Sequence, residues 1–121
     1  MSENNGRLTL YCNEVATNPL EDWRTDLVEV AFLGGDHKYE YIVIARTPYE
    51  DDIYIEHNDQ GNCLYAYYEN VAFALTEKSL LIDVENPETR DNLPCKFKII
   101  FAQTADKIDE VLAAIKLPTE G

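Results

Sequence analysis

The chain has 121 residues, of which 45% are hydrophobic and 27% are charged. This length supports one hydrophobic core rather than two domains, and the apolar content is too high for a disordered chain. The charge is unbalanced, because 23 acidic residues face 10 Lys and Arg, which gives a formal net charge of -13. Nucleic acid and anionic membranes are therefore poor partners, whereas a basic protein surface is a good one. Solubility alone is the simpler explanation of the acidity.

The chain reads as one domain over residues 1–121, with frayed tails at 1–6 and 117–121. Its first seven residues are polar and lack the basic start and apolar stretch of a signal peptide. No apolar run approaches the roughly 20 residues that span a bilayer. Three cysteines are odd in number and widely spaced, which does not suit a disulfide framework. We expect a cytoplasmic protein without disulfides.

Alternation of apolar and polar residues, and concentrations of β-branched and aromatic residues, predict strands. They cover residues 8–12, 27–33, 37–46, 53–57, 63–68, 71–76, 80–84 and 96–101. Between them, residues 13–26 predict an irregular segment or short helical turn around Trp23. Residues 34–36 predict a hairpin turn, because glycine and aspartate favour one. Residues 58–62 predict another turn, and residues 85–94 a polar loop with two prolines.

The period of the apolar residues changes after residue 103. One helical stripe, at spacing i, i+3, i+4 and i+7, consists of Ile108, Val111, Leu112 and Ile115. Thr104 is the expected N-cap, and Pro118 ends the helix. Strands followed by one helix, without βαβ alternation, predict an α+β fold. We expect a curved, mostly antiparallel sheet of about seven strands with the C-terminal helix packed on it.

A catalytic interpretation starts at residues 56–59, where Glu56, His57 and Asp59 could bind a metal or transfer protons. Neighbouring residues of a strand point to opposite faces, so Glu56 and His57 converge only across a bulge. The spacing also matches no metal-binding motif, no phosphate-binding loop and no hydrolase triad. A pairing of Cys63 with His57 lacks the signature of a cysteine nucleophile. We therefore expect no catalytic site, no metal and no cofactor.

Aromatic and acidic residues lie side by side in several places. Tyrosine and tryptophan supply large contact area with few rotatable bonds, and acids around them steer a basic partner. The candidate partner-binding residues are Trp23, Tyr49, Glu50, Asp51, Asp52, Tyr54, Glu56, Asp59, Gln60 and Tyr65. In the simpler interpretation, several of these tyrosines face the core and only their hydroxyls reach the surface.

Three stretches carry a resemblance to a known family. They are HKYEYIVIAR at 37–46, IYIEHNDQGNCLYAYY at 53–68, and the strand–strand–helix tail over 71–115. Over residues 37–116 the chain resembles the Immunity protein 10 family of bacterial polymorphic-toxin systems. The matching positions, an aromatic or apolar residue, an acid, an Asp-Gln turn and a tyrosine, are Tyr54, Glu56, Asp59, Gln60 and Tyr65. The chain departs from the family at Ala66-Tyr67, where relatives usually have small residues.

The resemblance implies a cytoplasmic, non-enzymatic protein that binds and neutralises a cognate toxin domain without a cofactor. The sequence leaves open whether the protein is a monomer or a homodimer. Two alternatives stay open. One is a small-molecule-binding module or enzyme that uses the interior of the curved sheet, with Tyr54, Glu56 and Tyr65 lining a pocket. The other is a nucleic-acid mimic, whose acids would stand in for phosphates.

Overall fold

A computed structural model describes residues 7–18, 28–34, 40–46, 50–90, 93–101 and 108–116. In these ranges nine strands form one sheet, in the order β6-β7-β9-β1-β2-β3-β4-β5-β8. The elements are β1 (Leu8–Asn18), β2 (Val28–Gly34), β3 (Glu40–Arg46), β4 (Asp52–His57), β5 (Asp59–Tyr67), the 3-10 turn η1 (Tyr68–Asn70), β6 (Val71–Leu75), β7 (Ser79–Val84), β8 (Thr89–Arg90), β9 (Lys96–Phe101) and helix α1 (Ile108–Ile115).

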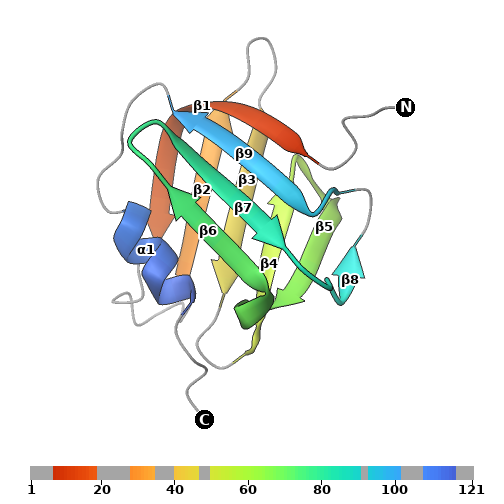
Figure 1. The fold of residues 1–121 in the computed structure, drawn as a ribbon. Coiled ribbons are helices and arrows are strands. Elements are labelled where there is room, and N and C mark those ends of the chain that lie inside the picture. The colour runs from red at the N-terminus through yellow and green to blue at the C-terminus, as the bar shows by residue number, and fades with distance from the viewer. Residues whose placement is uncertain are drawn as a thin grey trace.

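The sheet curves back over itself. Figure 1 shows β6, β7 and β9 crossing in front of β2, β3 and β4, with β1 joining the two halves at the top. Strand β1 pairs with β9 in parallel, and every other described pairing is antiparallel. The predicted α+β class, with a mostly antiparallel sheet and one C-terminal helix packed on it, is confirmed.

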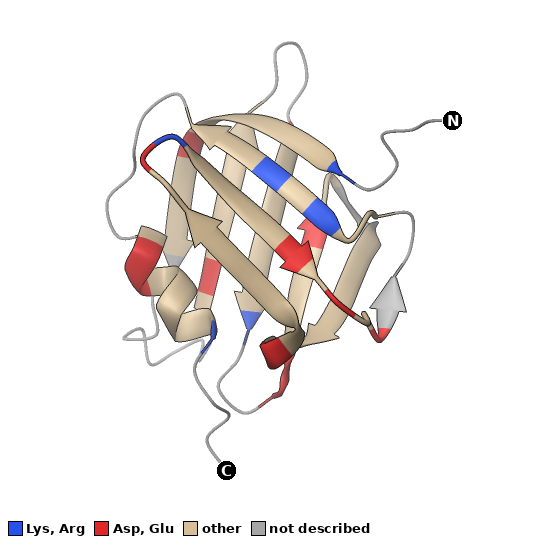
Figure 2. Ribbon diagram, viewed as in Figure 1, with Lys and Arg blue, Asp and Glu red and all other residues tan. Residues whose placement is uncertain are grey.

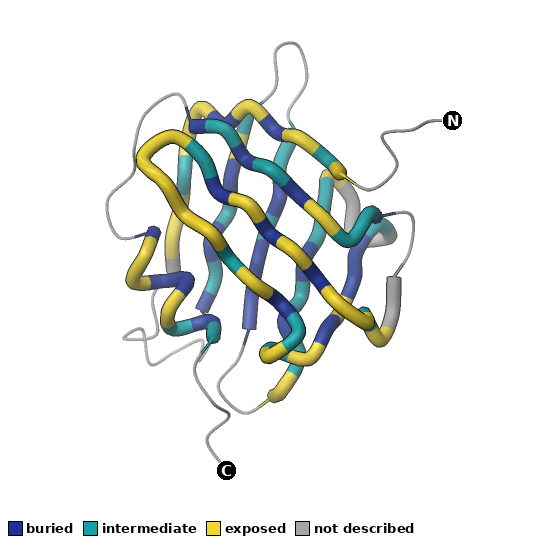
Figure 3. The backbone as a smooth tube through the Cα atoms, in the orientation of Figure 1, coloured by how far each residue is buried: buried dark blue, intermediate teal, exposed yellow. Residues whose placement is uncertain are grey.

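Alternation along the strands separates an inner from an outer face (Figure 3). Val30, Ile44, Ile55 and Leu64 lie side by side across β2 to β5, and each is 0% exposed. Their neighbours in sequence point the other way, because successive side chains of a strand alternate between faces. The inner residues of both halves of the sheet belong to one hydrophobic core.

Helix α1 packs its predicted apolar stripe into this core. Ile108, Val111, Leu112 and Ile115 are all 5% exposed or less, which confirms the stripe, and α1 lies mainly against β2. Burial of these four side chains against the sheet, rather than the propensity of so short a helix, stabilises α1. The expected N-cap and the terminal proline lie outside the described residues.

Two cationic side chains hold the C-terminal end of α1. Arg46, only 4% exposed, donates from Nη1 to the Ile115 carbonyl oxygen at 2.7 Å and from Nε to the Glu50 carbonyl oxygen at 3.0 Å. Its guanidinium carbon lies 4.2 Å from the centre of the Tyr68 ring. Lys116 Nζ donates to the carbonyl oxygens of Tyr68 and Val71. Positive charge at this end complements the helix dipole.

The strand predictions are wrong in three places, and pairing between distant segments explains each. Strand β1 continues through residues 13–18, because a register shift between Cys12 and Glu14 restores pairing with β2. Strand β5 already begins at Asp59, which leaves Asn58 alone in the turn. The predicted loop 85–94 contains the short strand β8, which pairs with β5. The described sheet therefore has one strand, β8, that none of the eight predicted ranges includes.

Two residues adopt tight local geometry that makes these pairings possible. Asn58 has a φ of 64°, and its side-chain oxygen accepts a hydrogen bond from the Tyr41 amide at 2.8 Å. Asparagine tolerates this left-handed conformation better than most residues. Gly34 belongs to β2 rather than to a turn, opposite Cys12. A Cβ atom there would lie 2.0 Å from the Tyr11 carbonyl oxygen, so the close approach of β1 requires glycine.

Candidate partner-binding face

The outer face of β2 to β5 carries a row of four residues. Glu29 lies opposite Ala45, Ala45 opposite Tyr54, and Tyr54 opposite Tyr65. All four alternate with core residues and therefore point away from the core. Ala45 contributes only a methyl group between larger neighbours, which leaves a depression in the row.

This depression is a pocket of about 370 Å³, which we call the hollow. Its lining residues are Glu29, Ala45, Arg46, Glu50, Asp52, Tyr54 and Tyr65. Together with Tyr41 and Glu56, which adjoin it on the same face of the sheet, these residues form what we call the tyrosine–acid face. The face combines carboxylates with aromatic rings, the composition that the sequence pattern indicates for a binding surface.

A carboxylate fixes the tyrosines of this face in place. The hydroxyls of Tyr41 and Tyr54 donate to the two carboxylate oxygens of Glu56, one to each. The Tyr54 ring packs against the Tyr65 ring, with centroids 5.1 Å apart and planes inclined at 52°. Burial, and secondly the hydrogen bond to Glu56, raise the pKa of Tyr54. The ring wall is therefore held before any partner arrives.

Acids gather where β4 begins. Glu50 and Asp51 precede the strand, and Asp52 is its first residue (Figure 2). The Glu88 side chain hydrogen-bonds to Asp52, and its amide donates to the Tyr65 carbonyl oxygen at 2.8 Å. The hydrogen bond to Asp52 and the charge of that residue raise the pKa of Glu88, because two adjacent carboxylates resist ionising together. This end of the face favours a cation.

The structure brings together some of the predicted partner-binding residues and separates others. Tyr54, Tyr65, Glu50 and Asp52 line the hollow, with Asp51 and Glu56 beside it. The backbone of Asp59 pairs with His57 at the opposite end of β4, and Gln60 follows it. The side chains of Asp59 and Gln60, and all of Trp23 and Tyr49, lie outside what the structure describes.

Sequence reasoning missed Glu29, Tyr41, Ala45 and Arg46 as members of this face. Alternation along 27–33 and 37–46 places the first three on one side of their strands. Nothing local, however, indicates which strands lie next to one another. That neighbourhood comes from the register of β2 with β3 and of β3 with β4.

The predicted interior pocket is also corrected by this geometry. Tyr54 and Tyr65 line a hollow on the outer face, and Glu56 lies beside it on that face. The intervening residues Ile53 and Ile55 are 0% exposed and belong to the core that fills the curved sheet. A ligand site inside the curve would have to displace this core.

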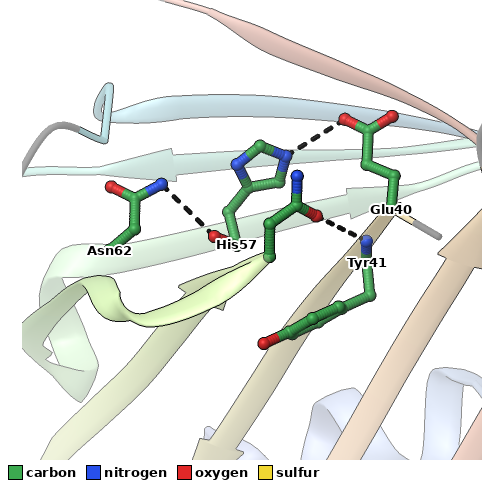
Figure 4. A network of polar contacts seen from close by, with 5 residues as sticks. Glu40, Tyr41, His57 and Asn62 are labelled. Carbon is green, nitrogen blue, oxygen red and sulfur yellow. Dashed lines mark hydrogen bonds and ion pairs between the residues drawn. The ribbon is translucent and has the colours of Figure 1, made fainter. Parts of the chain in front are cut away.

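The second polar cluster lies at the other end of β3 and β4 (Figure 4). His57 Nε2 lies 3.0 Å from Glu40 Oε2, and the side chains are 14% and 32% exposed. Asn62 Nδ2 donates to the His57 carbonyl oxygen at 3.2 Å. Glu56 instead contacts Tyr41 and Tyr54. Glu56 and His57 therefore point to opposite faces, as the strand geometry predicted.

Metal-binding groups and thiols give no further site. Among the described residues, no group of three His, Cys, Asp or Glu side chains is placed to hold a metal ion. Cys12 and Cys63 are buried and Cys95 is partly buried, and none of these three thiols forms a disulfide. Burial raises the pKa of the Cys12 thiol, which disfavours the reactive thiolate.

Within the described part of the chain, no helix is long and apolar enough to cross a membrane. Comparisons with protein-family models, curated proteins and solved structures found no match. The resemblance of residues 37–116 to the Immunity protein 10 family therefore stays a prediction.

Proposed function

We propose that this protein is an immunity protein, which binds and neutralises a toxin domain through the tyrosine–acid face. The observation that carries the proposal is the hollow, in which three carboxylates and two tyrosine rings meet on one outer surface. The partner surface that complements it is basic. The resemblance to the Immunity protein 10 family suggests that the partner is a toxin domain. The residues of the tyrosine–acid face suggest that the contacting surface of this partner is basic.

The rings and the acids have different parts in such an interface. The Tyr54 and Tyr65 rings are held in contact, and Tyr65 is 40% exposed, so contact area is available at little entropic cost. The acids at the start of β4 attract a basic partner over longer distances. Acids at the rim therefore govern association, and the rings, which the partner would cover, govern dissociation.

A small-molecule-binding role is the second candidate, because 370 Å³ falls at the lower end of the range of ligand pockets. Such pockets bury most of their ligand and are mainly apolar. This hollow is open on the outer face of the sheet and has three acidic residues in its lining, so a small ligand would stay partly in solvent. A protein side chain that enters from a covering partner suits it better.

We expect the gene beside the one for this chain to encode a toxin, and the proposal is tested with that toxin's domain. Co-expression should rescue growth of cells that make the toxin domain, and the two purified proteins should form a complex. Surface plasmon resonance across a salt series then resolves both rates. Changing Glu50, Asp51 and Asp52 together to their amides should slow association about tenfold at low salt and flatten its salt dependence.

A matched control separates steering by this face from the effect of overall charge. Changing Glu14, Asp83 and Glu110 to their amides removes the same three charges from exposed positions on β1, β7 and α1. Association should stay within about twofold of wild type with this control, since it leaves the local field of the face intact. Equal slowing by both triple variants, or failure to rescue growth, would refute the proposal.

Aromatic contact is tested separately on the dissociation rate. Tyr65→Ala removes an exposed ring from the wall of the hollow. Loss of a hot-spot tyrosine should speed dissociation about thirtyfold, which corresponds to about 2 kcal/mol. Tyr11→Ala is the control, because Tyr11 on β1 is 65% exposed and does not line the hollow. Dissociation unaffected by Tyr65→Ala would place the partner on another face.

A further inference from the structure

We infer that the hollow receives an arginine side chain of the partner protein. This inference rests on the proposed function and adds to it the residue type that the partner must present. It follows from three features of the hollow: its excess of negative charge, its paired tyrosine rings and its size.

The charge of the hollow favours one cation. Among the described residues that line the hollow, three are acidic (Glu29, Glu50 and Asp52) and one is basic (Arg46), so their formal charges sum to minus two. Asp51 and Glu88 lie close to Asp52 and add to this excess. A cation beside the Asp52–Glu88 pair relieves the repulsion between these two carboxylates.

Arg46 is held in place by helix α1 and by the Tyr68 ring as well as by the segment before β4. Its Nη1 donates to the carbonyl oxygen of Ile115, at the negative end of the α1 dipole. Its guanidinium also lies over the Tyr68 ring at 4.2 Å. Because these contacts hold Arg46 at 4% exposure, its guanidinium forms a fixed part of the wall of the hollow.

The walls and the volume of the hollow select a planar group on a long side chain. Tyr54 and Tyr65 offer two inclined rings, and Ala45 keeps the space between Glu29 and Tyr54 open. A volume of about 370 Å³ accepts one side chain but not a folded segment. Charged groups on two strands, Glu29 on β2 and Asp52 on β4, border the same space.

Arginine satisfies these conditions better than lysine. Its planar guanidinium stacks on aromatic rings, carries five N–H donors in a fixed fork and is more weakly hydrated than an ammonium. Several carboxylates can therefore accept hydrogen bonds from one arginine while a tyrosine ring covers its face. A lysine ammonium has three donors, no planar face and a larger cost of desolvation.

The test titrates N-acetyl-arginine amide, as the probe, into the full ¹⁵N-labelled chain. Changes in the amide chemical shifts of the protein report binding. Saturable shifts should centre on residues 45, 52–54 and 65. The dissociation constant should lie in the millimolar range for a single side chain. N-acetyl-lysine amide should bind at least about fivefold more weakly, because it cannot stack. The citrulline analogue, which is of similar shape but uncharged, should not saturate.

Variants assign the binding to the hollow. Glu29→Gln combined with Asp52→Asn should weaken the probe at least about fivefold, and so should Tyr65→Ala. The control pair Glu14→Gln and Asp83→Asn removes the same charge elsewhere and should leave the affinity within about twofold. Dispersed amide spectra verify folding, and Glu29→Gln alone serves if the double variant does not fold.

Three results would overturn the inference: equal affinity for the lysine or citrulline probe, shifts centred away from the hollow, or equal weakening by the control pair. The failures of the two proposals are distinguishable. If the toxin still depends on the tyrosine–acid face while the arginine probe does not bind, only the arginine inference fails. If the probe binds but neither Tyr65→Ala nor the acid variants change the association or dissociation rate of the toxin, the proposed function fails. The occupant is then a free guanidinium compound, not a partner's arginine.

Discussion

Arg46→Ala gives the sharpest test of how the C-terminal helix is held. Arg46 is buried at 4% exposure and joins three segments: the chain before β4 through Glu50, helix α1 through Ile115, and η1 through the Tyr68 ring. Alanine removes both hydrogen bonds and the ring contact. It also leaves the last carbonyl of α1 without this donor in a buried position.

The magnitude follows from these contacts. Each hydrogen bond from a charged donor contributes about 1.5–3 kcal/mol, and a desolvated cation–π contact about 2 kcal/mol. The cost of burying the guanidinium offsets part of this sum. We expect Arg46→Ala to lower the free energy of unfolding by about 3–5 kcal/mol, the range for breaking a buried charged contact. Arg46→Lys should cost less, about 1–3 kcal/mol, because it keeps the charge but loses the fork.

Urea unfolding, followed by tryptophan fluorescence and far-ultraviolet circular dichroism, measures these values. Lys78→Ala is the control, because Lys78 is exposed in the turn between β6 and β7, and it should change stability by less than about 0.5 kcal/mol. Lys116→Met should be non-additive with Arg46→Ala, since both cations hold the same helix end. A loss of stability below about 1 kcal/mol for Arg46→Ala would refute the conclusion that Arg46 holds the end of α1.

Three further predictions concern stability. Leu112→Ala should cost about 2–5 kcal/mol in urea unfolding, and a change under about 0.5 kcal/mol would mean that α1 does not pack on the core. Gly34→Ala should lower stability by at least about 1–3 kcal/mol in thermal unfolding, because its Cβ would meet the Tyr11 carbonyl; an unchanged midpoint would contradict this close approach. Asp52 raises the pKa of Glu88 in the folded state. Because the folded protein binds the Glu88 proton more tightly than the unfolded chain does, protonation of Glu88 stabilises the fold below the unfolded pKa. This contribution to the free energy of unfolding is lost as pH rises through the folded pKa. Glu88→Gln should therefore flatten the decrease in stability with rising pH in a urea series across acidic pH.

Periodicity in the sequence predicts an element well when its structure does not depend on which particular segment packs against it. The stripe of α1 needs only an apolar surface to pack on, and its four positions are buried. Alternation at 53–57 likewise assigns Ile53 and Ile55 to one face and Tyr54 and Glu56 to the other. The structure confirms this division, because core packing requires one face of each strand to be apolar.

Features that depend on pairing between distant segments could not be predicted this way. The polar residues 13–18 resemble a loop, and they form a strand because β2 supplies hydrogen-bonding partners after the bulge. The two residues of β8 are a strand only through β5. The row that forms the hollow needs the register of four strands, so Glu29 has no local signal that connects it with Tyr65.

The packing of the core also determines which surface is left for binding. In the described residues, the curved sheet encloses its apolar side chains, and α1 packs against β2 with its own apolar stripe. Aromatic residues that the core does not use are held on the outside by polar contacts, as Tyr41 and Tyr54 are held by Glu56. Arg46 connects the core-packed helix with the tyrosine–acid face, because it holds the end of α1 and also lines the hollow. Its charge also interacts with Asp51 and Asp52, but the acidic residues that line the hollow outnumber it, so the face still attracts a basic partner.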